Sequence, residues 1–155
     1  MTTARKIIID TDPGQDDAVA ILLALASPEL KVIGITVVAG NVPLPLTELN
    51  TRKVVELAGS PDIPIFAGCS EPIDRKLVTA EHVHGHTGLD GPVLPDPSIK
   101  LQSKHAVDYL IETLRYTADV TICPLGPLTN IATALQRAPE IATNIREIIL
   151  MGGGY

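Results

Sequence analysis

Short apolar runs alternate with segments whose apolar residues recur at helical spacing along most of this chain. Runs rich in Val and Ile predict strands at residues 6–10, 31–38, 63–67, 120–123 and 147–151. Helical spacing predicts helices at residues 16–26, 47–58, 104–116 and 128–137, with a helical turn at 139–143. Strands that are apolar throughout and separated by helices predict an α/β fold: an open, mainly parallel sheet with helices on both faces.

Polar and glycine-rich segments follow the carboxyl ends of these predicted strands. They are residues 12–17, Asn41, the loop from Gly68, residues 125–127 and residues 152–154. In open parallel sheets, ligands bind outside the carboxyl ends of the strands. The sequence therefore predicts one site built from several loops along one edge of the sheet.

Residues 68–103 interrupt the alternation, because they hold several of the thirteen prolines and show no clear period. A loop this long in a compact domain is usually functional or disordered. Its middle carries His82, His84 and His86 among glycines. These imidazoles are candidates for a transition-metal site, but no Cys or further His nearby completes one, and surface polar residues are the alternative.

Composition adds limits to this picture. The 155 residues suffice for one domain with a sizeable core, so we expect a single α/β domain over residues 1–155. The chain is 45% hydrophobic and 19% charged, with no apolar run near the roughly 18 residues of a membrane helix. The N-terminal residues lack a signal-peptide pattern, which favours a cytoplasmic protein without a membrane partner. A net charge of −6 argues against nucleic acid as a partner.

Four carboxylates crowd the turn between the first strand and the first helix: Asp10, Asp12, Asp16 and Asp17. Like charges held this close either raise one another's pKa or share a cation. The Pro-Gly pair between them bends the chain so that the acids can converge, and carboxylate oxygens are the ligands that Ca²⁺ and Mg²⁺ select. Helix capping is the alternative, but it accounts for Asp16 or Asp17 and leaves the other two unexplained. We therefore predict a site for a hard divalent cation.

The segment Asp-Thr-Asp-Pro-Gly-Gln-Asp-Asp-Ala at residues 10–18 resembles the N-terminal signature of the inosine-uridine nucleoside hydrolases, and the resemblance continues along the chain. It implies the N-terminal half of such an enzyme, with an α/β fold and a tightly bound Ca²⁺. The implied reaction is hydrolysis of the N-glycosidic bond of ribonucleosides to ribose and free base, in a homo-oligomer (dimer or tetramer). The loop from His84 onward looks most like that of pyrimidine-preferring members, which favours uridine and cytidine.

The resemblance also implies a role for each matching acid in the metal site. Asp12 corresponds to the general base and a calcium ligand, and Asp17 to a bidentate ligand. Asp10 would support the metal shell from behind. Leu125, in a Pro-Leu-Gly-Pro turn, matches a position whose backbone carbonyl binds calcium, and Ca²⁺ readily accepts carbonyl oxygens.

On the substrate side, the resemblance implies that Asp16 and Asn41 hold the ribose. His84 matches a histidine close to the base, and an imidazole titrates near neutrality, which suits proton donation to the leaving group.

Two alternatives stay open from the residues alone. Family members are about twice this length, and a further calcium aspartate, a ribose-binding Glu and Asn pair and a second histidine match positions beyond Tyr155. A truncated, non-catalytic fragment that binds nucleoside and calcium is therefore one alternative. The other is a phosphoryl-transfer enzyme that uses Asp10 and Asp12 with Mg²⁺. It would require a lysine and a further acid after later strands, and residues 147–151 carry no acid at their carboxyl end.

Overall fold

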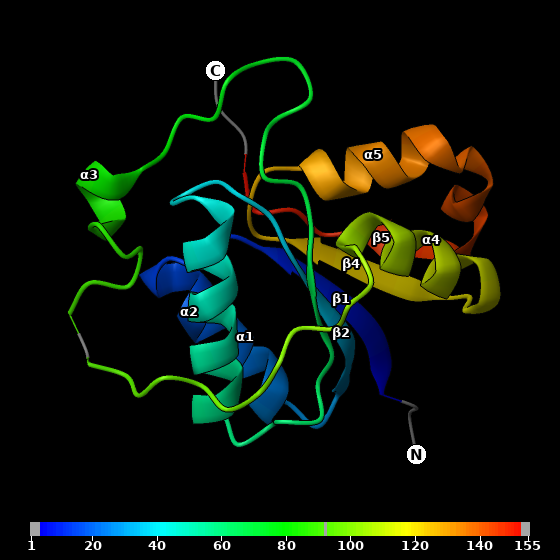
Figure 1. Ribbon diagram of the computed structural model, residues 1–155. Coiled ribbons are helices and arrows are strands. Elements are labelled where there is room, and N and C mark those ends of the chain that lie inside the picture. Colours follow the sequence, from blue (N-terminus) through cyan, green and yellow to red (C-terminus); the bar gives the residue numbers. More distant parts are fainter. Residues whose placement is uncertain (1–3, 92, 153–155) are drawn as a thin grey trace.

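The computed structural model describes residues 4–91 and 93–152 (Figure 1). Its five strands are β1 (Arg5–Thr11), β2 (Leu30–Val37), β3 (Ile65–Ala67), β4 (Val120–Pro124) and β5 (Ile145–Ile148). Its helices are α1 (Gln15–Ala26), α2 (Leu44–Leu57), α3 (Glu81–His84), α4 (Ala106–Tyr116), α5 (Thr129–Arg137) and the 3₁₀ helix η1 (Pro139–Asn144). The strands pair in parallel in the order β3-β2-β1-β4-β5. The predicted α/β fold with an open parallel sheet is confirmed.

The strand order reverses next to β1, the central strand. The chain first builds outward through β2 to β3 and then crosses to β4 and β5 on the other side. Helices α1 and α2 pack on one face of the sheet, whereas α4 and α5 pack on the opposite face (Figure 1). The point where the order reverses is where ligands bind in folds of this kind, so the carboxyl ends of β1, β2 and β4 are the first place to look for a site.

Both faces of β1 are buried, which explains its unbroken apolar run. Ile8 points into the cluster made with α4 and α5, whereas Ile7 and Ile9 point into the cluster made with α1 and α2. All three side chains are at most 3% exposed. Because successive side chains of a strand point to opposite faces, a strand covered on both sides needs apolar residues at every position.

Several element boundaries differ from those expected: β3 and α4 each begin two residues later, and the starts of α2 and β5 also move. Helix α2 begins at Leu44 and not at residue 47, because Pro45 falls in the first turn, where a missing N–H breaks no helical hydrogen bond. Strand β5 begins at Ile145, two residues earlier than expected, because η1 delivers the chain directly to the edge of β4. The extended chain continues past the end of β5, since the N–H of Ile149 donates to the Ile122 carbonyl at 2.9 Å.

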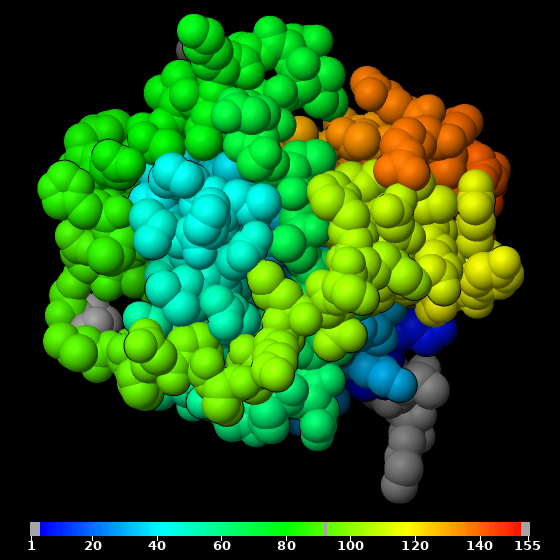
Figure 2. Space-filling view, in the orientation of Figure 1, coloured from blue at the N-terminus to red at the C-terminus, as the bar shows by residue number. Residues whose placement is uncertain are grey.

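The segment 68–103 is more ordered than its lack of period suggested. It contains the short helix α3 and forms a parallel bridge between Gln102 and Phe66 of β3. The Glu56 carboxylate accepts hydrogen bonds from the N–H groups of Ser98 and Ile99 at 2.8 and 3.0 Å. Figure 2 shows this segment wrapped around α2 on the visible face of the molecule. In the described part of the chain, none of the helices is both long and apolar enough to cross a membrane.

Candidate active site at the carboxyl edge of the sheet

The Asp12 carboxylate sits where the ends of three strands meet. Its Oδ2 accepts a hydrogen bond from the N–H of Asn41 at 2.7 Å, and the Asn41 side-chain amide donates to the Asp12 carbonyl at 2.9 Å. A Cβ added at Gly40 would lie 2.0 Å from Oδ2, and one added at Gly126 would lie 2.1 Å from Oδ1. The turns after β2 and β4 therefore close on Asp12 from two sides, and only glycine leaves room for the carboxylate.

Asp17 is buried at the start of α1. Its Oδ1 accepts from the Thr11 hydroxyl at 3.1 Å, and its Oδ2 accepts from the Gly14 N–H at 3.0 Å. This carboxylate thus closes the turn and caps the helix, as the alternative interpretation from the sequence proposed. A carboxylate has about four lone-pair sites, so capping leaves Asp17 able to bind a cation as well.

Asp10 is fully buried on the face of the sheet that α5 covers. Its Oδ1 accepts from the Thr36 hydroxyl at 2.5 Å and from the Asn130 side-chain amide at 2.8 Å, while its Oδ2 has no hydrogen-bond partner among the described residues. Asn130 also donates to the Val37 carbonyl at 3.1 Å and accepts from the Cys69 N–H at 2.8 Å. These hydrogen bonds link the carboxyl end of β1 to the end of β2 and to α5, and so stabilise the backbone that leads to Asp12.

His84 is brought to the same place from segment 68–103. A Cβ added at Gly14 would lie 2.5 Å from His84 Nδ1 and 3.1 Å from the side-chain nitrogen of Asn41. The Ala80 N–H donates to the Asn41 carbonyl at 2.9 Å, which ties the start of α3 to the turn after β2. The structure therefore places His84 and Asn41 beside the turn between β1 and α1 (residues 12–14), called the Asp-rich turn below. Asp16 lies exposed on the first turn of α1.

Burial raises the pKa of all three inward carboxyl groups. The pKa of Asp10 rises to about 6 and that of Asp12 to about 7, in both cases mainly because the groups are removed from water. The same cause raises the pKa of Asp17. The ion pairs found among the described residues involve none of these three acids. Buried carboxylates without a positive partner are costly, so a bound cation would offset a large unfavourable charge here.

The donors present fit a hard cation but supply only part of its shell. Asp12 and Asp17 offer carboxylate oxygens, and the Leu125 N–H donates to the Asp10 carbonyl at 2.7 Å, which fixes the Leu125 backbone on this rim. Residues 4–91 and 93–152 hold no group of three or more His, Cys, Asp or Glu side chains arranged as a metal site. That result also leaves the three-histidine interpretation without support. Oxygen donors alone select Ca²⁺ or Mg²⁺ over transition metals.

A groove of about 540 Å³ lies next to Asp12. Gly40, which lies against the Asp12 carboxylate, lines this groove together with Pro127. Its larger apolar side chains include Ile73, Leu77 and Val78 of segment 68–103 and Leu128 at the start of α5, and Asp74 and Arg75 also line it. Space next to the Asp-rich turn is therefore available for a small organic ligand.

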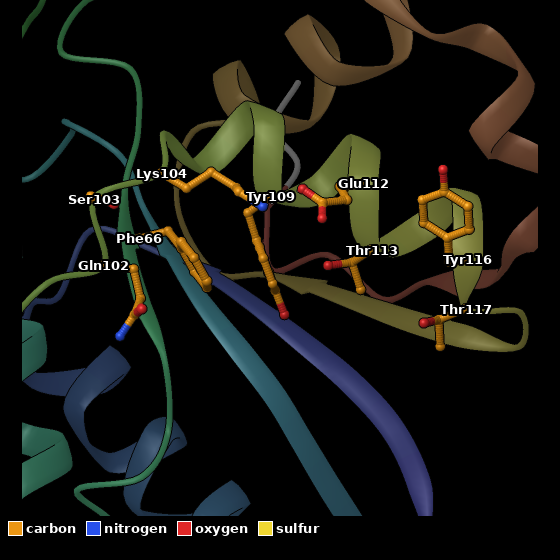
Figure 3. Close-up of a pocket in the computed structure, with 9 residues that line it drawn as sticks. All are labelled: Phe66, Gln102, Ser103, Lys104, Tyr109, Glu112, Thr113, Tyr116 and Thr117. Carbon is orange, nitrogen blue, oxygen red and sulfur yellow. Dashed lines mark hydrogen bonds and ion pairs between the residues drawn. The ribbon is translucent and has the colours of Figure 1, made fainter.

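A second hollow, of about 470 Å³, lies beside α4 (Figure 3). Phe66 and Tyr109 stack on each other there with ring centroids 3.8 Å apart, and Lys104 pairs with Glu112. Its charged groups are thus exposed and already neutralised. Unlike the rim around Asp12, it holds no buried acid that would demand a ligand.

Several residues that organise the site were not singled out from the sequence. The sequence pattern assigns no role to Asn130, Thr36, Asn50 or Gln15. Thr36 could have been noticed as a polar residue inside an apolar strand. The others carry no local signal, because their partners lie 37 to 120 residues away in the sequence.

Gly126→Ala should displace the Asp12 carboxylate and weaken cation binding at least tenfold, because the new Cβ would overlap Oδ1. Calorimetric titration with Ca²⁺ measures the loss, and circular dichroism checks the fold. Gly59→Ala is the control, since its Cβ would meet none of the described atoms within 4 Å, so any effect there comes from backbone strain at its φ of +66° and not from contact with Asp12. Equal affinities in the two variants would show that Asp12 does not contribute to the site.

Comparison with known proteins shows the family to which this chain belongs. The family described as inosine-uridine preferring nucleoside hydrolase matches residues 7–155. The chain is 53% identical over 152 residues to an uncharacterised protein of Schizosaccharomyces pombe, covering 97% of this chain and 49% of that protein. It is 47% identical over 152 residues to the pyrimidine-specific ribonucleoside hydrolase RihB of Escherichia coli, covering 97% of this chain and 48% of that protein.

Solved structures agree with the sequence comparison. A plant nucleoside hydrolase, PpNRh1, superposes with a TM-score of 0.88 at 42% identity, covering 97% of this chain and 48% of that one. A purine-preferring ribonucleoside hydrolase from Gardnerella vaginalis superposes with a TM-score of 0.91 at 37% identity, covering 97% and 49%. The chain spans about half the length of the relatives it matches. It belongs to the inosine-uridine preferring nucleoside hydrolase family.

Proposed function

We propose that this chain carries the general base, part of a calcium site and the leaving-group acid of a ribonucleoside hydrolase that cleaves the N-glycosidic bond. One observation carries the proposal. The Asp12 carboxylate is enclosed by the turns after β2 and β4 and lies in the same cluster as His84 and Asn41. A carboxylate fixed beside a candidate proton donor and a ribose-binding amide is placed to act as a general base.

The residues of the chain divide the chemistry between them. Asp12 takes a proton from water as the water oxygen forms a bond to C1′ of the ribose. The C1′–N bond breaks, its electron pair leaves with the base, and His84 supplies the proton that neutralises it. Asn41 donates a hydrogen bond to Oδ2 of Asp12 and so fixes the orientation of the carboxylate. When bound by Asp12, Asp17 and the Leu125 carbonyl, Ca²⁺ supplies positive charge that offsets the carboxylates and acidifies water.

The substrate proposal is a pyrimidine nucleoside whose ribose contacts Asp16 and Asn41. It is supported by the 47% identity to a hydrolase described as pyrimidine-specific. A purine-preferring relative at 37% identity shares the same fold, so the two base classes must be compared directly. The test is release of free ribose from uridine, cytidine and inosine, with added Ca²⁺ and with a chelator. The polypeptide tested carries both halves of the family fold, and release from none of the three nucleosides would overturn the proposal.

A non-catalytic fragment is the second candidate, because Asp12, Asp17 and the Leu125 carbonyl supply only part of the six to eight oxygens that Ca²⁺ prefers. Such a fragment would bind nucleoside and Ca²⁺ without turnover. Binding of uridine by this chain, measured by calorimetry, together with no ribose release would distinguish it from the enzyme. Homo-oligomerisation and a cytoplasmic location stay predictions from the family resemblance.

His84→Ala should slow hydrolysis of uridine by about a hundredfold or more and slow p-nitrophenyl riboside much less. An acid matters most when the leaving group is a poor anion, and p-nitrophenolate is a good one. His86→Ala is the matched control, because His86 is an exposed histidine on the same loop. Equal slowing of both substrates by His84→Ala would contradict a role in leaving-group protonation.

A further inference from the structure

The Gln15 side-chain amide bridges the first turn of α1 and the loop that carries His84. Its Oε1 lies 2.8 Å from His84 Nδ1. Its Nε2 donates to the His84 carbonyl at 3.2 Å and to the Asp90 carbonyl at 3.4 Å. One exposed amide thus makes three contacts with a single loop, and none of the roles assigned above involves it.

These contacts leave one orientation for the amide and one protonation pattern for the ring. Backbone carbonyls only accept hydrogen bonds, so the NH₂ group of Gln15 must face the carbonyls of His84 and Asp90. Oε1 must then face the imidazole, and because an amide oxygen only accepts, His84 Nδ1 must carry the proton. In the neutral ring the lone pair is therefore on Nε2.

The loop itself is held in place by other residues. The Asn50 side chain donates to the carbonyls of Thr87 and Pro13 at 2.7 and 3.3 Å. The Asp90 carboxylate accepts from the N–H groups of His86 and Thr87, each at 3.1 Å. These other residues therefore hold the loop in place. Among the described residues, Gln15 is the one that hydrogen-bonds to the His84 ring.

We propose that Gln15 is a positioning residue that holds His84 as the Nδ1–H tautomer, so that Nε2 is the atom that gives the proton to the departing base. This inference rests on the proposed function for its catalytic meaning. In the step itself, the Nε2–H bond of the imidazolium breaks, the proton goes to the base, and the electron pair stays on Nε2. The ring returns directly to the tautomer that Gln15 stabilises and need not rotate between turnovers.

Nitrogen NMR of the 155-residue chain tests the tautomer without any turnover. At a pH where the imidazoles are neutral, His84 should show a protonated Nδ1 and an unprotonated Nε2, opposite to the form that free imidazole side chains prefer. His105 is an internal reference, because its Nδ1 accepts from the Val107 N–H at 3.2 Å and its proton must be on Nε2. A His84 pattern matching that of His105 would overturn the proposal.

Two variants separate the ring contact from loop docking. Gln15→Met keeps a side chain of similar length without an acceptor, and should return most of His84 to the Nε2–H form. Asn50→Ala loosens the loop but keeps the acceptor, and should leave the Nδ1–H form dominant. An equal change in both variants would assign the effect to loop docking and contradict a specific role for Gln15. Because the readout needs no hydrolysis, an inactive chain would still give a decisive result.

Discussion

Asp12→Asn is expected to remove most nucleoside hydrolysis while leaving the fold intact. The asparagine oxygen can still accept the N–H of Asn41, and its shape fits the space between Gly40 and Gly126. It cannot take a proton from water at neutral pH. Loss of a general base costs about a hundredfold to ten-thousandfold in rate, and the lost negative charge would weaken cation binding in addition.

The measurement is kcat/KM for uridine in a polypeptide with both halves of the family fold, with thermal unfolding as the check on structure. Asp62→Asn is a matched control. It makes the same change of charge at an exposed acid before β3, at the opposite edge of the sheet from Asp12. We expect the control to keep full activity. Uridine turnover near the unmodified level with Asp12→Asn would reject Asp12 as the base.

The fold and the proximity of Asp12 and Asn41 could be predicted because both depend on patterns that are local in sequence. Strands buried on two faces must be apolar throughout, as Ile7, Ile8 and Ile9 are, and helices between them enforce parallel pairing. Once the strands are parallel, their carboxyl ends share one edge, so Asp12 and Asn41 had to approach one another. No knowledge of side-chain packing was needed for that step.

The supporting contacts could not be predicted in the same way. Asn130 bonds to Asp10 across 120 residues of sequence and Gln15 bonds to His84 across 69. Each looks like an ordinary polar residue of a helix first turn until the tertiary fold places its partner. Helix α3 is only four residues long, too short for a helical period to be visible, and its position depends on the docking of the whole loop.

The chain exposes an apolar surface on the α1 side of the sheet, and this surface is the basis of the second prediction. Residues 18–26 of α1 are all Ala, Val, Ile or Leu, and a helix that is apolar on every side is normally buried. Yet Val19 and Leu23 are 64% and 67% exposed. A groove of about 280 Å³ beside them is lined almost wholly by apolar side chains, including Ile7, Ile9, Cys123 and Leu125.

The length of the relatives suggests what normally covers this surface. They are about twice as long as this chain, and we expect the part of each relative beyond the matched half to pack against an apolar face such as this one. Exposed apolar surface and the open edge at β5 favour association of copies when that half is absent. Asp12, Asp17 and one carbonyl also fall short of the six to eight oxygens that Ca²⁺ prefers.

The 155-residue chain alone is therefore expected to self-associate, bind Ca²⁺ weakly and hydrolyse nucleosides poorly. Light scattering measures the association, calorimetry the calcium affinity, and ribose release the activity. Leu23→Lys should shift the chain toward monomer, because it places a charge on the apolar surface. Val93→Lys, at a side chain 99% exposed on a loop outside this surface, should leave association unchanged. A monomeric chain with tight calcium binding and ordinary uridine turnover would show that the other half of the family fold is dispensable.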